Sequence, residues 1–201
     1  HWKGAVIFWQ MDIEQKLRTG KIMLYDQKSG KRVKQPFNHI HWVHALLENK
    51  KERENFNLTQ CFFGEHLLKF TPGQKVAIVE SEKTAIIASM YFPDYVWLAS
   101  GSLVNISVEK CKVLKGRQVI LFPDLQGLDK WKVKANEIRQ RLGLNIKVFE
   151  WLESVADKAD IQNGYDLADF LVTCNEKGQA LTENGIPIED VIKLKFKNDR
   201  I

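Results

Sequence analysis

Two acidic residues, Glu80 and Asp124, each follow a short apolar run of the sequence. Glu80 comes directly after residues 75–79, and Asp124 comes one proline after residues 118–122. Such runs are typical of strands buried on both faces of a parallel sheet, and the carboxyl ends of those strands meet at one edge, where ligands bind. Two carboxylates at one edge repel each other unless a cation lies between them. The pattern therefore predicts a divalent-cation site formed by Glu80 and Asp124.

Three further side chains could belong to the same site. Asp166 and Asp169 are three residues apart, which would put them on one face of a helix. Asp166 could equally be the residue that caps this helix. Lys83 should lie one turn into the helix after Glu80, where it or the free amides of the helix could bind a phosphate. The alternatives are an ordinary surface lysine for Lys83 and an exposed strand-end acid for Glu80.

The elements that must position these residues alternate regularly from residue 75 onward. Strands are expected at 75–79, 96–99, 118–122 and 145–149, and helices at about 82–91, 108–114 and 128–142, the last ended by Gly143. This order predicts an α/β fold with a Rossmann-like parallel four-stranded sheet and helices on both faces. A small, basic, β-rich and partly helical subdomain precedes it, so we expect domains at 1–72 and 73–201.

The acidic segments resemble the motifs of the toprim domain, an α/β module shared by bacterial-type primases, topoisomerases and related nucleases. Residues 80–85 (ESEKTA) resemble its first motif, with Ser81 where glycine is usual. Residues 98–102 (LASGS) resemble the small-residue turn after its second strand. Residues 122–127 (FPDLQG) resemble the motif that typically carries Asp-x-Asp. Gln126 then stands in place of the second aspartate or, if Gly127 sets the frame, Phe122 stands in place of the first.

The resemblance implies chemistry on phosphodiesters with Mg²⁺ or Mn²⁺. Glu80 would act as general base or metal ligand, Asp124 would hold the metal, and Asp166 or Asp169 would be the counterpart of a further acid in the family. The implied protein is a primase-like nucleotidyltransferase of DNA replication, from a plasmid or mobile element. Its partners would be single-stranded DNA or RNA and nucleotides, and a helicase could be another.

Two alternatives stay open because one carboxylate of the Asp-x-Asp pair is missing. One is a catalytically impaired nucleic-acid-binding module that keeps the toprim fold, and the other is a toprim nuclease. The sequence is therefore compatible with an enzyme and with a non-catalytic protein. A dinucleotide-binding enzyme is disfavoured because no Gly-x-Gly-x-x-Gly follows the first strand of the alternating region.

The excess positive charge lies entirely in the first sixty residues. They contain eleven Lys and Arg against six Asp and Glu, whereas the remaining residues contain nineteen of each. A basic segment beside a neutral one suggests a polyanionic partner, with a merely solvated surface as the alternative. The candidate nucleic-acid contacts are Arg18, Lys21, Lys31 and Arg32. Trp9 and Tyr25 could stack on unpaired bases or pack in the core.

Local patterns in this basic segment predict a hairpin and two helices. Residues 4–11 and 21–26 should pair, with the turn ending at Gly20. A helix should include residues 42–47, and another should run from a cap at Asn57 or Thr59 to Leu68.

Histidine and cysteine spacings indicate no metal centre or disulfide framework. His39, His41 and His44 could share helix or strand faces, but no carboxylate or cysteine lies nearby at ligand spacing, so buried or surface histidines are expected. The cysteines, at positions 61, 111 and 174, are too far apart in sequence for a Cys-x-x-Cys site. No apolar run is long enough for a membrane span, and a reduced, cytoplasmic setting is expected.

Overall fold

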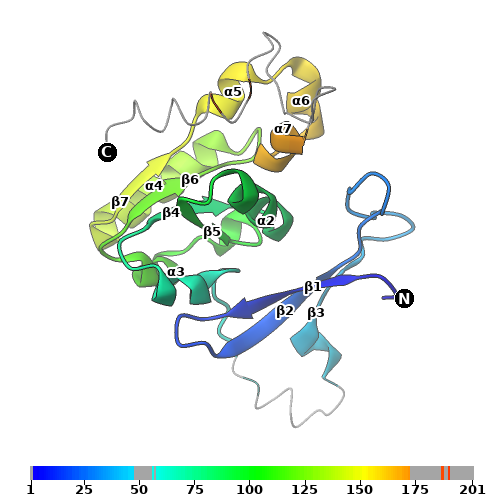
Figure 1. The fold of residues 1–201 in the computed structure, drawn as a ribbon, viewed down its shortest axis with the longest axis horizontal. Coiled ribbons are helices and arrows are strands. Elements are labelled where there is room, and N and C mark those ends of the chain that lie inside the picture. Colours follow the sequence, from blue (N-terminus) through cyan, green and yellow to red (C-terminus); the bar gives the residue numbers. More distant parts are fainter. Residues whose placement is uncertain (1, 48–55, 57, 173–186, 188–189, 191–201) are drawn as a thin grey trace. The chain divides into compact units, whose positions relative to one another are not determined.

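The structure, a computed structural model, describes residues 2–47, 56, 58–172, 187 and 190 of the chain; Cys174 and Asn57 lie outside them. The chain divides into two compact units, His1–Phe70 and Thr71–Ile201, which are described separately below (Figure 1). None of the described helices combines the length and the apolar character needed to cross a membrane.

The second unit is built on a four-stranded parallel sheet. Its strands are β4 (Lys75–Val79), β5 (Tyr95–Ala99), β6 (Gln118–Leu121) and β7 (Asn145–Val148), in the order β5-β4-β6-β7. β4 is central, and its residues from Val76 to Val79 have no exposed surface. Such complete burial explains why the run is uniformly apolar and does not alternate with polar residues. The predicted α/β fold with a parallel four-stranded sheet is confirmed.

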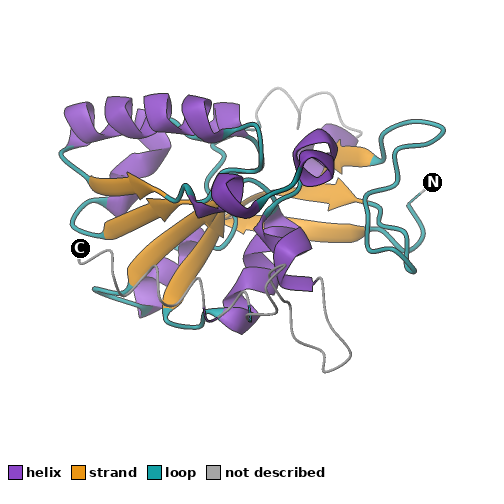
Figure 2. Ribbon diagram, turned by 90° about the horizontal axis from the view of Figure 1, so that it is seen from above, coloured by secondary structure: helices purple, strands orange, loops and turns teal. Residues whose placement is uncertain are grey.

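Helices connect the strands and cover the sheet on both sides (Figure 2). The chain leaves β4 toward β5 in one direction and then proceeds to β6 and β7 in the other, so right-handed crossovers put the connecting helices on opposite faces. The helical segments of this unit are α2 (Glu82–Tyr91), η3 (Leu103–Asn105), α3 (Val108–Cys111), η4 (Lys112–Leu114), α4 (Leu128–Leu142), α5 (Trp151–Val155), α6 (Lys158–Asn163) and α7 (Leu167–Val172). α2 packs against α7, and α3 packs against α4.

α4 shows how the sequence specifies one of these layers. Trp131, Ala135 and Ile138 are buried at the spacing of one helix face, and the remaining positions are largely charged. Gly143 ends the helix with a φ of 63°, a left-handed conformation that glycine adopts without steric cost. The predicted helix over 128–142 and its glycine stop are confirmed.

The first unit contains an antiparallel sheet of β1 (Val6–Met11), β2 (Leu17–Met23) and β3 (Ile40–Trp42). The predicted hairpin is present, but the predicted turn is wrong. The chain reverses at residues 12–16, where the Asp12 amide donates to the Lys16 carbonyl at 3.0 Å. Gly20 lies inside β2 opposite Trp9, where a Cβ would come within 3.0 Å of Ile7, Trp9 and Val43 side chains. Glycine is needed there for close packing and does not mark a turn.

The two helices predicted in this unit are also corrected. Residues 40–42 form β3, which is followed by the short 3-10 segment η1 (Val43–Leu46). The second predicted helix is limited to the 3-10 segment η2 (Glu65–Phe70). Gly64, immediately before η2, has a φ of 83°, which does not continue a right-handed helix from the preceding residues.

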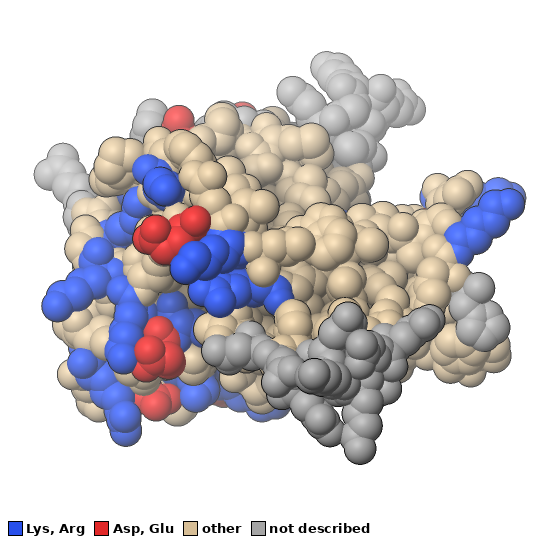
Figure 3. Space-filling view, turned by 90° about the horizontal axis from the view of Figure 1, so that it is seen from below, with Lys and Arg blue, Asp and Glu red and all other residues tan. Residues whose placement is uncertain are grey.

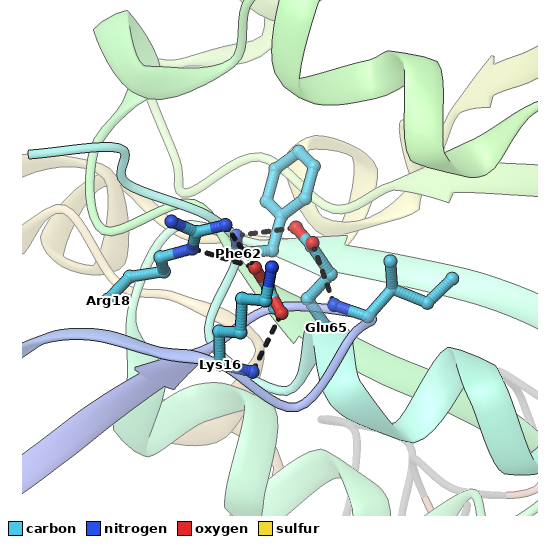
Figure 4. Close-up of polar contacts among 6 residues, drawn as sticks. Lys16, Arg18, Phe62 and Glu65 are labelled. Atoms are coloured by element: carbon cyan, nitrogen blue, oxygen red, sulfur yellow. Dashed lines mark hydrogen bonds and ion pairs between the residues drawn. The ribbon is translucent and has the colours of Figure 1, made fainter. Parts of the chain in front are cut away.

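A buried carboxylate joins the β1–β2 turn to the segment before η2 (Figure 4). Glu65 is 6% exposed, and it accepts hydrogen bonds from the backbone amides of Ile13 at 3.2 Å and Phe62 at 3.1 Å. Beside it, Asp12 accepts from the Lys16 amide and forms an ion pair with Arg18 at 2.6 Å. These contacts hold an irregular turn in one conformation, since its polar groups are satisfied by specific side chains.

We predict that Glu65→Ala destabilises the first unit by about 2–3 kcal/mol, because two backbone amides lose their acceptor in a poorly hydrated site. Glu65→Gln should cost less, since the amide oxygen can still accept one of the bonds. The measurement is hydrogen exchange of the β1 and β2 amides. Glu14→Ala, at an exposed position of the same turn, is the control. Equal protection in Glu65→Ala and the control would contradict this role.

Candidate cation site at the carboxyl edge of the sheet

Glu80 and Asp124 lie at the same edge of the second unit's sheet. β4 and β6 are adjacent, with Ile78 opposite Leu121, and the Phe122 amide extends the pairing by donating to the Ile78 carbonyl at 2.8 Å. Glu80 is the first residue beyond β4, and Asp124 follows β6 by three residues. The strand register therefore brings both residues, each half-buried, to the carboxyl ends of neighbouring strands.

Backbone hydrogen bonds fix the chain on either side of Glu80. The Ser100 amide donates to the Val79 carbonyl at 3.0 Å, and the Gly101 amide donates to the Glu80 carbonyl at 2.8 Å. Gly101 has a φ of 79°, so the turn after β5 passes close to Glu80 in a conformation suited to glycine. The small-residue turn noted in the sequence thus supports the Glu80 backbone.

The turn that carries Asp124 is tight. The Gly127 amide donates to the Asp124 carbonyl at 2.9 Å, and a Cβ on Gly127 would lie 2.9 Å from that same oxygen. No side chain fits at position 127 without moving the Asp124 backbone. The Leu125 amide donates to the Tyr165 carbonyl at 2.9 Å, which links this turn to the segment before Asp166.

Asp166 and Asp169 form a reciprocal cap at the start of α7. The Asp169 amide donates to Asp166 Oδ1 and the Asp166 amide donates to Asp169 Oδ2, each at 3.1 Å. The other carboxylate oxygen of Asp166 accepts a hydrogen bond from Thr84 Oγ1 in α2. Asp166 is therefore the helix cap that one interpretation of the sequence expected, and it is also attached to the helix that follows Glu80.

The four acids share one electrostatic environment. Burial, and then the negative charges of Asp166, Glu80 and Asp169, raise the pKa of Asp124 to about 8. Burial also raises the pKa of Asp166, against the opposing effects of the Thr84 hydrogen bond and the positive charge of Lys83. The charges of Glu80, Asp166 and Asp169 thus act on Asp124, and those of Asp169 and Lys83 act on Asp166. A cation at this edge would relieve the repulsion between the acids.

The described acids at this edge do not form an enclosed metal centre. Within the described residues, no three His, Cys, Asp or Glu side chains are grouped so that they could hold one metal ion. Asp166 already uses both oxygens in hydrogen bonds. Mg²⁺ requires only one or two protein carboxylates when waters and substrate phosphates complete its coordination, and Glu80 with Asp124 can supply them.

The histidines are engaged in ring contacts. His41 stacks on Trp2 with ring centroids 5.6 Å apart, and His39 stacks on Phe37 at 4.4 Å. His44 exchanges a hydrogen bond with Thr19 Oγ1 at 2.8 Å. Packing and hydrogen bonding thus account for His39, His41 and His44.

The four predicted basic contacts in the first unit have different surroundings. Lys21 is 8% exposed, and Arg18 is held by Asp12, so neither presents a freely extended charge. Lys31 and Arg32 are exposed, in the loop between β2 and β3. In the second unit, Lys112 pairs with Glu109 at 2.6 Å. On the face drawn in Figure 3, Lys and Arg side chains predominate, with a few acidic side chains among them.

The two candidate stacking residues also differ. Trp9 is 42% exposed, whereas Tyr25 meets Phe8 edge to face, with ring centroids 6.2 Å apart, and donates to Met23 Sδ at 3.5 Å. Tyr25 therefore packs on the core side of the sheet, and Trp9 is the ring that remains accessible.

The side-chain contacts of two residues at the site were not predicted from the sequence. Thr84 donates to an acid 82 residues away, and the Gln126 side-chain amide donates to the Ile161 carbonyl. Both pairs depend on how α6 and α7 fold back onto the sheet edge. Only the position of Gln126, in place of an expected acid, marked it as unusual.

The family described as "Domain of unknown function (DUF6371)" matches residues 1–125, more than half of the chain. The chain belongs to the DUF6371 family. The match includes the first unit, Glu80 and Asp124, and it ends before Asp166. No curated protein matches the DUF6371 chain.

One solved structure similar to this DUF6371 chain is that of a bacteriophage T7 lagging-strand DNA polymerase interacting with primase domains bound to an RNA/DNA hybrid and dTTP. A chain of that structure is 15% identical, with a TM-score of 0.43, and the similarity covers 71% of this chain. The DUF6371 chain spans 63% of the length of its counterpart.

We predict that, without divalent cations, Asp124→Asn stabilises the protein at pH 8 by about 1–3 kcal/mol and has little effect near pH 4. A raised pKa means that the folded protein binds more protons than the unfolded chain between about pH 4 and pH 8. The contribution of protonated Asp124 to the free energy of unfolding is therefore fully present at low pH and is lost as the pH rises toward 8. Urea unfolding across this range measures the effect.

The matched control for this experiment is Asp94→Asn, which neutralises an exposed acid that precedes β5. Its stability should follow the wild-type pH dependence. A wild-type stability that is flat between pH 5 and pH 8 would contradict the expected protonation of Asp124.

Proposed function

We propose that this protein is a toprim-like, Mg²⁺-dependent enzyme that transfers nucleotidyl groups on single-stranded nucleic acid, as a primase does. The observation that carries the proposal is the environment of Asp124, a carboxylate at a strand end whose pKa is raised by burial and by three neighbouring acids. Such a cluster is costly in the absence of a cation, and perturbed acids of this kind concentrate at functional sites.

In this mechanism Glu80 and Asp124 hold one cation. When bound, Mg²⁺ neutralises the charge that develops on the phosphoryl oxygens of the substrate. Thr84 and the α7 cap keep Asp166 fixed beside the pair, so its charge adds to the attraction for the cation. Lys83, whose positive charge acts on Asp166, could contact a substrate phosphate from the first turn of α2.

The first unit would bind the template strand. The exposed side chains of Lys31 and Arg32 would contact phosphates, and the accessible ring of Trp9 would stack on an unpaired base. Arg18 and Lys21 contribute less, because one is ion-paired and the other buried. A replication protein of a plasmid or mobile element is the setting that the resemblance to toprim primases suggests.

A nucleic-acid-binding module without catalysis is the second candidate. It is favoured by Gln126, which stands where the toprim pattern has an acid, and by the lack of any three-ligand group among the described residues. A protein of this kind would keep the basic first unit and the fold of the second, and would bind strands without turning over nucleotides.

We predict that Glu80→Gln and Asp124→Asn each weaken Mn²⁺ binding at least tenfold, because a single neutral amide replaces one of only two charged ligands. Electron paramagnetic resonance of free Mn²⁺ measures this. The same variants should lose template-dependent incorporation of ribonucleotides on single-stranded DNA. Asp94→Asn should match the wild type in both experiments.

The outcomes separate the candidate functions. Mn²⁺ binding that is equal in wild type, Glu80→Gln and Asp124→Asn would remove the cation site. Strand binding without incorporation, in a protein that binds Mn²⁺, would favour the non-catalytic module. Strand cleavage that depends on Asp124 would favour a nuclease.

For the first unit, we predict that two classes of substitution respond differently to salt. Lys31→Ala with Arg32→Ala should weaken oligonucleotide binding and reduce the slope of log affinity against log salt by about 1.4, or about 0.7 for each lost phosphate contact. Trp9→Ala should weaken binding by about 1–3 kcal/mol with the slope unchanged, because stacking releases no counterions. Fluorescence anisotropy at several salt concentrations measures both.

Lys130→Ala, an exposed residue of α4, is the control for the charge change. If Lys31, Arg32 and Trp9 variants all bind as the wild type does, the strand does not contact this face of the first unit.

A further inference from the structure

Gln126 adopts a backbone conformation that disfavours its residue type. Its φ is 72°, and among the described residues only one other non-glycine, Gln15, has a positive φ. The left-handed region is sterically unfavourable for a side chain without the short polar reach of Asn or Asp. A glutamine retained in such a conformation suggests that its side chain makes a compensating contact.

That contact is a hydrogen bond to a distant segment. The Gln126 side-chain amide donates to the carbonyl of Ile161 in α6. One residue earlier, the Leu125 amide donates to the Tyr165 carbonyl at 2.9 Å. Leu125 and Gln126, two adjacent residues of the turn after β6, thus bond to Tyr165, which follows α6, and to Ile161 within α6.

The position of these two bonds relates them to the acids. Leu125 directly follows Asp124, and Tyr165 directly precedes Asp166. The Leu125–Tyr165 bond therefore joins the residue after Asp124 to the residue before Asp166, and the Gln126–Ile161 bond lies beside it. The Thr84 hydrogen bond and the α7 cap fix the Asp166 side chain itself, but neither of these contacts reaches the Asp124 turn.

We propose that Gln126 is a positioning residue that ties the Asp124 turn to α6 and so sets the distance between the Asp124 and Asp166 carboxylates. The inference rests on the proposed function. It adds an explanation of how a site with one acid fewer than the toprim pattern keeps its geometry. An aspartate at position 126 could not make this bond, because an ionised carboxylate accepts hydrogen bonds and has no donor for a carbonyl.

The test uses two variants that are compatible with the left-handed backbone at position 126 but remove the hydrogen bond to Ile161, which is called the tether below. Gln126→Gly relieves the left-handed strain, and Gln126→Asn tolerates that conformation while its side chain is one methylene too short to keep the bond. Both should fold with a thermal midpoint equal to or above that of the wild type. Both should weaken Mn²⁺ binding tenfold or more, as lost outer contacts of metal ligands do. A merely structural residue would not give unchanged stability together with lost affinity.

A second measurement does not depend on any cation. Hydrogen exchange of the Leu125 amide should become at least tenfold faster in both variants, and the Asp166 amide resonance should shift. The Gly101 amide, which bonds to Glu80 on the other side of the site, should be unaffected and is the internal control.

Each result bears on a different claim. Unchanged Leu125 exchange in both variants, or faster exchange with unchanged Mn²⁺ affinity, would overturn the role of Gln126. If the wild type binds no Mn²⁺, the proposed function fails, while faster Leu125 exchange with a shifted Asp166 resonance would still support the tether.

Discussion

The constraint on which the second unit depends is the repulsion among carboxylates gathered at one sheet edge. Parallel pairing of β4 and β6 brings Glu80 and Asp124 together, and α7 adds Asp166 and Asp169. Repulsion between carboxylates is stronger in a half-buried environment than in water, so favourable interactions must offset it at this edge. The structure supplies some of it through the Thr84 hydroxyl, two backbone amides and the charge of Lys83. In the function proposed above, a cation held by Glu80 and Asp124 would supply the rest.

The rigid interior beneath this edge makes such an arrangement tolerable. The strand residues below Glu80 are fully buried, and the rings of Trp97, Phe122 and Phe149 form a continuous series, with neighbouring centroids 5.1 and 4.7 Å apart. Close packing of this kind resists the small displacements by which like charges would otherwise separate. In the first unit, the Glu65 carboxylate accepts from the backbone amides of Ile13 and Phe62.

Local patterns in the sequence predicted the second unit well, because its strands and helices have distinct hydrophobic periods and Gly143 marks a helix end. The first unit was predicted less well. Gly20 suggested a turn, but it serves packing against Trp9, and the helix expected up to Leu68 is interrupted at Gly64. At the site, strand order predicted that Glu80 and Asp124 would meet. The bonds of Thr84 and Gln126 could not be predicted, since their partners are brought near only by the return of α6 and α7 to the sheet.

The bond between Thr84 and Asp166 also has a consequence for the order of assembly. Its two residues are 82 positions apart, so the acid cluster closes only after the chain has been made well past β7. Contacts of such long sequence separation carry the largest loop-closure cost and form late. During synthesis, the first unit and the early strands can fold while Glu80 and Asp124 still lack their third neighbour. The nascent protein would thus complete its cluster of acids last, after the strands that carry Glu80 and Asp124 have formed.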